Sequence, residues 1–183
     1  MIYQIKCGNL NNFSMWVLDN NAGMTIHDFI LEGKAIQWNK PPRVVPFFDK
    51  KRKKQKDVAD FAFFLHGGIA LSEKAYDAIH DFLLSFGELI QLDTEDKKVW
   101  LYNVTTLIDC VDYKNSEKFL DQVIREKFYF SNVPDAPCIF KDTLTAKSRI
   151  YLNEAAKVVV EKIVDSNNLT GCHIEEAGLS DMY

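Results

Sequence analysis

The chain has 183 residues, of which 47% are hydrophobic and 26% are charged, and its formal net charge at pH 7 is −4. These values are typical of an ordinary globular domain and exclude a mostly disordered chain. The longest stretches without a charged residue, 7–18 and 61–72, have 12 residues each, whereas a membrane-spanning helix needs about 20 apolar residues. We therefore expect no transmembrane helix and no membrane partner.

Residues 1–58 predict only short elements. Tyr3 and Ile5 alternate with polar neighbours as in a short strand, and residues 13–18 predict a second one. Thr25 is a candidate N-cap for a short helix that ends at Gly33. Residues 43–48 predict an extended segment, because Pro46 confines it to the edge of a sheet.

A run of six cations follows, formed by Lys50, Lys51, Arg52, Lys53, Lys54 and Lys56. Six of the 22 basic residues lie in this run, so 16 basic and 26 acidic residues remain elsewhere, a balance of −10. The run contains no aromatic residue for base stacking, and we interpret it as a solvated loop. An acidic body with one basic loop suits a basic protein partner better than a nucleic acid.

From residue 60 onward the pattern of apolar and polar residues predicts secondary structure more clearly. Residues 61–65 and 69–71 predict strands that flank Gly67 and Gly68, which we interpret as a tight turn or bulge. Ser72 is a good N-cap, and a single apolar stripe then predicts a helix over about 72–86. Segments 88–92 and 99–104 predict a hairpin, and further strands are predicted at 105–111, 123–130 and 138–140.

The C-terminal part predicts a similar unit. A short strand at 150–152 leads into the N-cap Asn153, a helix over about 153–166 and a final strand at 172–175. The segments 71–75 and 152–156 are alike, and shared capping chemistry is the simpler explanation for two such units. These elements indicate an α+β fold with mixed or antiparallel sheets and two main helices. We expect an N-terminal region, 1–58, and an α+β domain, 59–183, that together form one compact unit.

The four cysteines have no metal-binding or disulfide-framework spacing. Cys7, Cys110, Cys138 and Cys172 are separated by 103, 28 and 34 residues, which indicates four buried thiols in a reducing compartment. The first residues lack the basic and apolar regions of a signal peptide. A cytoplasmic protein is therefore expected.

No catalytic, phosphate-binding or cofactor-binding motif is present, so we expect a protein that is not an enzyme and holds no cofactor or metal. The candidate binding residues are instead those of a protein interface. They are the acidic hairpin tip formed by Asp93, Glu95 and Asp96, the loop residue Trp38, and His66 in a loop after a strand. We interpret Trp100 as a core residue and His80 as solvated.

Residues 60–176 resemble a family of bacterial immunity proteins from polymorphic toxin systems, the eleventh immunity class, formerly a domain of unknown function. The resemblance rests on short segments at 67–68, 71–73, 100–104, 107–112, 139–140, 150–153, 169–171 and 173–175. It implies an α+β protein without catalytic residues that binds and blocks a cognate protein toxin. Residues 1–58, including the basic run, lie outside it.

Three hypotheses follow from the sequence. The first is a cytoplasmic immunity protein that neutralises a toxin by stoichiometric binding, with its oligomeric state left open. The second is a metal-dependent hydrolase that uses Asp109, Asp112 and His66, of which the two carboxylates would share a face on a helix but not on a strand. The third is a nucleic-acid-binding module that works through the run 50–56.

Overall fold

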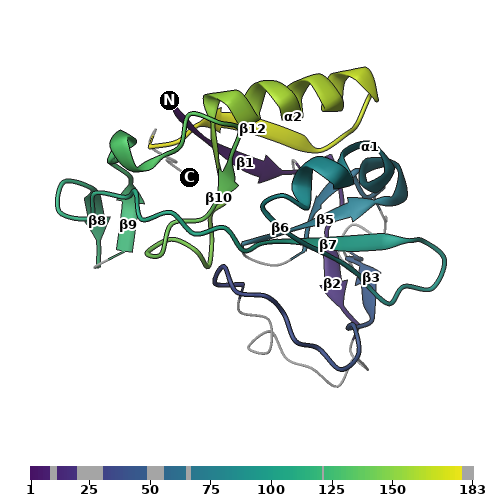
Figure 1. Ribbon diagram of the computed structural model, residues 1–183. Coiled ribbons are helices and arrows are strands. Elements are labelled where there is room, and N and C mark those ends of the chain that lie inside the picture. The colour runs from purple at the N-terminus through teal and green to yellow at the C-terminus, as the bar shows by residue number, and fades with distance from the viewer. Residues whose placement is uncertain (9–11, 20–30, 49–55, 65–66, 121, 179–183) are drawn as a thin grey trace.

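The computed structural model describes residues 1–8, 12–19, 31–48, 56–64, 67–120 and 122–178. Within these ranges the chain forms two four-stranded sheets, two two-stranded ribbons and two α-helices (Figure 1). All the strand pairs are antiparallel. The α+β class expected from the sequence is confirmed.

Sheet 1 joins the beginning of the chain to its end. Its order is β10-β11-β1-β12, with β1 at Ile2–Cys7, β10 at Ile139–Phe140, β11 at Tyr151–Asn153 and β12 at Cys172–Glu176. The first strand of the chain therefore lies between two strands from its C-terminal part. Residues 1–58 thus contribute an interior strand to a sheet whose other strands come from residues 59–178.

Sheet 2 is built from the middle of the chain. Its order is β4-β5-β7-β6, with β4 at Phe61–Phe63, β5 at Gly68–Ser72, β6 at Gly87–Gln91 and β7 at Val99–Val104. The predicted hairpin is confirmed as the antiparallel pair β6–β7. The predicted tight turn before β5 is also confirmed, because Gly67 has a φ of +77° and a Cβ there would lie 2.9 Å from the carbonyl oxygens of Ala146 and Lys147.

Both predicted helices are present, and both begin at the predicted caps. Helix α1 covers Glu73–Leu83, and the Ser72 side chain accepts a hydrogen bond from the amide of Ala75. Helix α2 covers Glu154–Ser166, and the Asn153 side chain accepts one from the amide of Ala156.

The two sheets and their helices have the same topology. In sheet 2, α1 connects β5 to β6, and both strands flank β7; in sheet 1, α2 connects β11 to β12, and both strands flank β1. The sequence similarity between 71–75 and 152–156 therefore extends from the caps to the strand order. We call each sheet with its helix a unit. The two units differ in where their central strand lies in the chain: β7 comes after β5, α1 and β6, whereas β1 comes before β11, α2 and β12.

One core is shared by both units. The helices lie on the same side of the two sheets (Figure 1) and bury Ala75, Ile79 and Leu83 from α1 and Ala156 and Val160 from α2. Side chains of both sheets complete this cluster, among them Ile5 of β1 and Leu71 of β5. The helices are thus held by burial of their predicted apolar stripes.

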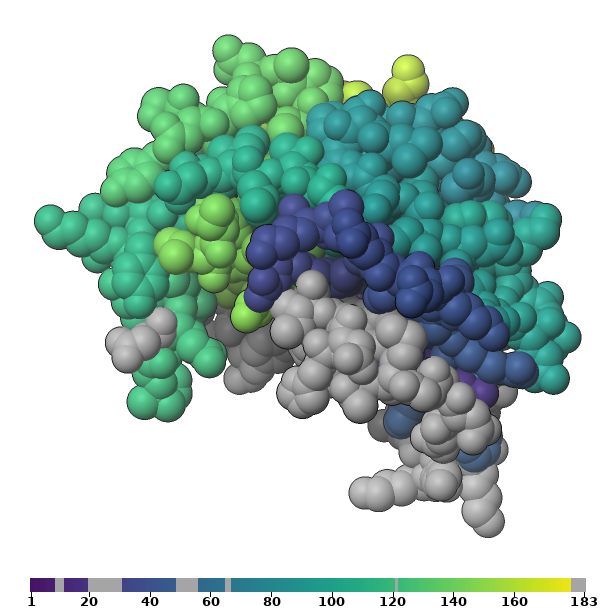
Figure 2. All heavy atoms as spheres, turned by 60° about the horizontal axis from the view of Figure 1, so that its bottom comes forward, coloured from purple at the N-terminus to yellow at the C-terminus, as the bar shows by residue number. Residues whose placement is uncertain are grey.

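A second layer covers the other face of sheet 2. It consists of the ribbon formed by β2 (Trp16–Leu18) and β3 (Val44–Pro46), and of residues 31–44, which we call the strap. Figure 2 shows residues 31–48 crossing the surface of the molecule. Side chains fasten the strap: Asn103 Nδ2 donates to the Lys34 carbonyl at 2.8 Å, and Glu88 Oε1 accepts from the Ile36 amide at 2.7 Å.

Residues 105–130 differ from the prediction. The prediction of a strand at 105–111 is wrong, because this segment makes only isolated bridges, at Leu107 and Val111. A ribbon of β8 (Glu117–Phe119) and β9 (Gln122–Arg125) follows, and then a 3₁₀ turn, Phe130–Asn132. All of β8 is exposed, so it lacks the alternating pattern that reveals a half-buried strand. Residues 25–30 of the helix expected between Thr25 and Gly33 lie outside the described ranges.

The four cysteines are free thiols in two different environments. Cys110 and Cys138 are buried as expected, whereas Cys7 and Cys172 are half-buried. Among the helices in the described ranges, neither has the length and hydrophobicity needed to cross a membrane.

Candidate protein-interaction surface

The predicted acidic hairpin tip borders a surface cleft. The loop between β6 and β7 and Pro41 of the strap line a hollow of about 540 Å³, to which Asp93, Glu95 and Asp96 all contribute. Glu95 and Asp96 are exposed, and Asp93 is half-buried. The residues singled out in the sequence therefore lie on an accessible surface of the molecule.

The strap holds this loop in place through the main chain. The Val44 amide donates to the Asp93 carbonyl at 2.8 Å, and the Asp93 amide donates to the Pro42 carbonyl at 3.1 Å. The loop is thus held to the fold by its main chain, while the side chains at 95–98 are exposed.

A column of three stacked rings lies on α1 and β7 beside this loop. The Tyr76 ring stacks on Trp100 at 4.2 Å between ring centres and on His80 at 4.7 Å, with interplanar angles of 18° and 12°. All three side chains are half-buried. The interpretation of Trp100 as a core residue is therefore corrected, because this ring is only half-buried and belongs to a surface column. His80 lies on the same column with its side chain partly exposed, as expected from its position on the polar side of the helix.

The helix that carries part of this column also carries exposed carboxylates. Glu73, Asp77 and Asp81 on the same helix are exposed. Together with Tyr76, His80, Trp100 and the loop 92–98 they form a surface that we call the acidic–aromatic face. Sequence reasoning missed the helical part of this face, although the spacing of Tyr76 and His80, four residues apart, places both on one side of a helix.

Cations neutralise the acidic–aromatic face only in part. Lys98 Nζ lies 2.5 Å from Glu73 Oε1, and this hydrogen bond raises the pKa of Lys98. An Arg43 nitrogen lies 3.8 Å from Glu95 Oε2, a loose contact between exposed groups. Asp77 and Asp96 form no ion pair within the described ranges. The face therefore keeps carboxylates that form no ion pair next to partly exposed aromatic rings.

Of the other two predicted interface residues, the structure describes only Trp38. Trp38 is half-buried and packs against the core cluster between the strap and sheet 2. That environment differs from the exposed anchor that the polar loop around it indicated. His66 lies outside the described residues.

The two carboxylates of the hydrolase hypothesis lie in different surroundings. Asp109 is exposed. Asp112 is buried and closes a turn, with its Oδ2 2.6 Å from Asn115 Nδ2 and its Oδ1 3.1 Å from the Asn115 amide. The Asn115 hydrogen bond lowers the pKa of Asp112. No group of three or more His, Cys, Asp or Glu side chains that could hold a metal ion occurs among the described residues.

The basic run contributes little to the described surface, because residues 50–54 lie outside the described ranges. Lys56 is described and is half-buried. The nucleic-acid hypothesis, like the hydrolase one, stays a prediction.

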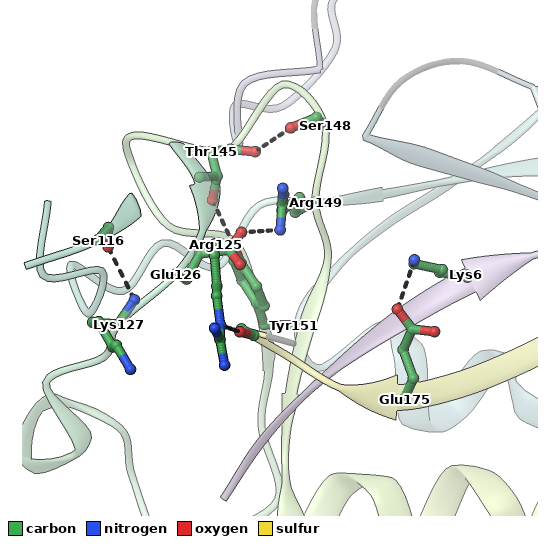
Figure 3. A network of polar contacts seen from close by, with 11 residues as sticks. Lys6, Ser116, Arg125, Glu126, Lys127, Thr145, Ser148, Arg149, Tyr151 and Glu175 are labelled. Carbon is green, nitrogen blue, oxygen red and sulfur yellow. Dashed lines mark hydrogen bonds and ion pairs between the residues drawn. The ribbon is translucent and has the colours of Figure 1, made fainter. Parts of the chain in front are cut away.

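A second polar cluster is buried and was not predicted. The Glu126 carboxylate accepts from the Tyr151 hydroxyl at 3.1 Å and pairs with Arg149, while the Tyr151 and Thr145 hydroxyls lie 2.9 Å apart (Figure 3). Burial and the neighbouring carboxylate raise the pKa of Tyr151. Glu126 lies 19 positions before Thr145, the first of the other three residues, and the four share no motif, so no local pattern could have revealed the cluster.

The chain is thus an α+β protein with an acidic–aromatic surface. No family model matches its sequence, and no curated protein does. Its function is therefore inferred from the surface itself.

Proposed function

We propose that this chain binds and inhibits a basic protein toxin through the acidic–aromatic face, in the manner of a bacterial immunity protein. The observation that carries the proposal is the stacked column of Trp100, Tyr76 and His80 bordered by carboxylates. Tyr and Trp are enriched at the energetic centres of protein interfaces, because they bury a large area at a low cost in side-chain entropy.

The charge of the face favours a basic partner. The exposed carboxylates of Asp77 and Asp96 repel acidic surfaces and attract cationic ones, which raises the association rate and selects the partner. Outside the run 50–56 the chain has 16 basic and 26 acidic residues, so the same preference extends over the rest of the molecule. The resemblance of residues 60–176 to immunity proteins supports inhibition as the outcome of binding.

The test is neutralisation of a toxin in bacterial cells. A candidate basic toxin domain, taken from the protein encoded next to this gene, would be expressed from an inducible promoter, with and without the full chain, and growth would be followed. We expect survival only with the chain. Equal killing in both strains would contradict the proposed inhibition.

The surface is tested separately with the purified proteins. Asp77→Lys combined with Asp96→Lys should weaken toxin binding by about 100-fold, because each reversal turns an attraction into a repulsion at an exposed site. Asp135→Lys, which reverses an exposed aspartate before β10, is the matched control and should bind like the wild type. If the control loses affinity and the double variant does not, the acidic–aromatic face is not the binding surface.

A further inference from the structure

Two cysteines lie opposite each other in sheet 1. Strands β1 and β12 are antiparallel, and their register pairs Cys7 with Cys172. Their spacing in the sequence gave no sign of this, because they lie 165 positions apart. The pair is created by the return of the C-terminal strand to the first strand of the chain.

The hydrogen bonds of the ladder define what kind of pair this is. The Gly8 amide donates to the Gly171 carbonyl at 2.7 Å, and the Ala177 amide donates to the Ile2 carbonyl at 3.0 Å. Hydrogen-bonded pairs alternate with non-hydrogen-bonded ones along an antiparallel ladder. Cys7 and Cys172 therefore form a non-hydrogen-bonded pair, in which the two side chains lie on one face and approach most closely.

This geometry is compatible with a disulfide bond. The Cα atoms of a non-hydrogen-bonded pair lie about 4.5 Å apart, and disulfide bonds bridge Cα distances of roughly 4.4–6.8 Å. Both residues are free thiols and half-buried. They lie at the end of the ladder, on strand β1 and on β12, which is the edge strand of the sheet.

We propose that Cys7 and Cys172 form a thiol–disulfide site that fastens the first strand of the chain to the last. The oxidant is a low-molecular-weight disulfide. One cysteine thiolate attacks it and releases one small thiol, and the second cysteine then displaces the other. The two cysteine thiols lose two protons and two electrons, one Sγ–Sγ bond forms, and the small disulfide is reduced to two thiols.

The bond would act on stability independently of the proposed toxin binding. It closes a loop that contains residues 8–171, and a disulfide stabilises the folded state more when it closes a longer loop of the unfolded chain. It also secures β12, which has a neighbouring strand on one side only.

The surroundings of the two thiols make the reaction slow at neutral pH. Burial raises the pKa of Cys172 to about 12, with a further contribution from Glu161 of α2. Burial, together with the neighbouring Cys172, also raises the pKa of Cys7. The thiolate is the attacking species. The rate of bond formation should therefore rise about tenfold for each pH unit between pH 7 and 9.

The experiment uses the purified full chain. The reduced protein is incubated with oxidised glutathione at pH 8.5, quenched with acid, and analysed by intact mass, peptide mapping and thermal unfolding. We expect a loss of two hydrogen atoms, a crosslinked peptide pair that contains residues 7 and 172, and a rise in Tm of roughly 5–15 °C. A folded protein that gains only glutathione adducts, or that links other cysteines, would overturn the proposal.

Two variants test the register. Cys7→Ala should abolish the crosslink. Cys172→Ala combined with His173→Cys moves the thiol by one residue to the opposite face of the strand, so it should also form no bond with Cys7. Thermal unfolding of each reduced variant shows whether it is folded. Efficient crosslinking of Cys7 to the displaced thiol in a folded variant would mean that the strand register does not determine the reaction, and it would refute the site.

Discussion

At the scale of single residues, the Glu126 cluster shows how a buried charge is accommodated. Glu126 is only 2% exposed, and its Oε1 atom accepts from Tyr151 and pairs with Arg149, while its Oε2 atom has no hydrogen-bond partner. Because a buried carboxylate is costly without a counter-charge, Arg149 is the residue on which the cluster depends.

The buried pair of Arg149 and Glu126 can be compared with the more exposed pair of Arg125 and Glu117. Arg149→Leu should destabilise the protein by about 3–5 kcal/mol, since it leaves the Glu126 charge buried and unpaired. Arg125→Leu removes a more exposed ion pair with Glu117 and a hydrogen bond to the Gly178 carbonyl, and should cost about 1 kcal/mol. Urea unfolding at pH 7 measures both. Equal losses would show that the Glu126 charge is not held by Arg149.

At the scale of elements, local chemistry explains why the helices were predictable. Ser72 and Asn153 are each followed by an acidic residue and an apolar stripe, and these signals act within one or two helical turns. Strands that lack such signals were less predictable. The apolar residues at 105–111 resemble a strand, but their backbone has no partner strand beyond two isolated bridges.

The two caps should differ in importance. Ser72 accepts from one amide and donates to Asp60, whereas Asn153 also accepts from the Cys138 amide and donates to the carbonyls of Pro134 and Ala136. Ser72→Ala should therefore cost about 1 kcal/mol, and Asn153→Ala about 2–4 kcal/mol, because the buried amides of Cys138 and Ala156 lose their acceptor. Thermal or urea unfolding of both variants is the measurement. A smaller loss for Asn153→Ala would contradict this account.

At the scale of the whole molecule, the strap connects the two units. Lys141, which follows β10, is fully buried, and its Nζ donates to the Leu31 carbonyl at 2.7 Å. Burial lowers the pKa of Lys141 to about 8. The same strap reaches the β6–β7 loop at its other end through Val44, so one segment links this lysine to the candidate interface.

This lysine predicts a pH dependence of stability. Its pKa is about 8 in the folded protein and about 10.4 in the unfolded chain. Between these values the unfolded chain binds more protons, so the contribution of Lys141 to stability becomes more favourable as the pH rises. The free energy of unfolding of the wild type relative to Lys141→Met should increase by roughly 2 kcal/mol from pH 7 to pH 10. Urea unfolding of both proteins across this range would show it, and parallel curves would contradict it.

The sequence by itself determined the α+β class, the caps and stripes of both helices, the β6–β7 hairpin and its acidic tip. Each of these depends on neighbours a few residues apart, so periodicity and cap chemistry suffice to predict it. Only the tertiary structure decided that β1 pairs with β11 and β12, that Trp100 stacks on Tyr76, that Glu126 meets Arg149 and that Cys7 faces Cys172. Those contacts join residues between 23 and 165 positions apart, and they follow from how the sheets bury their faces, which no local pattern records.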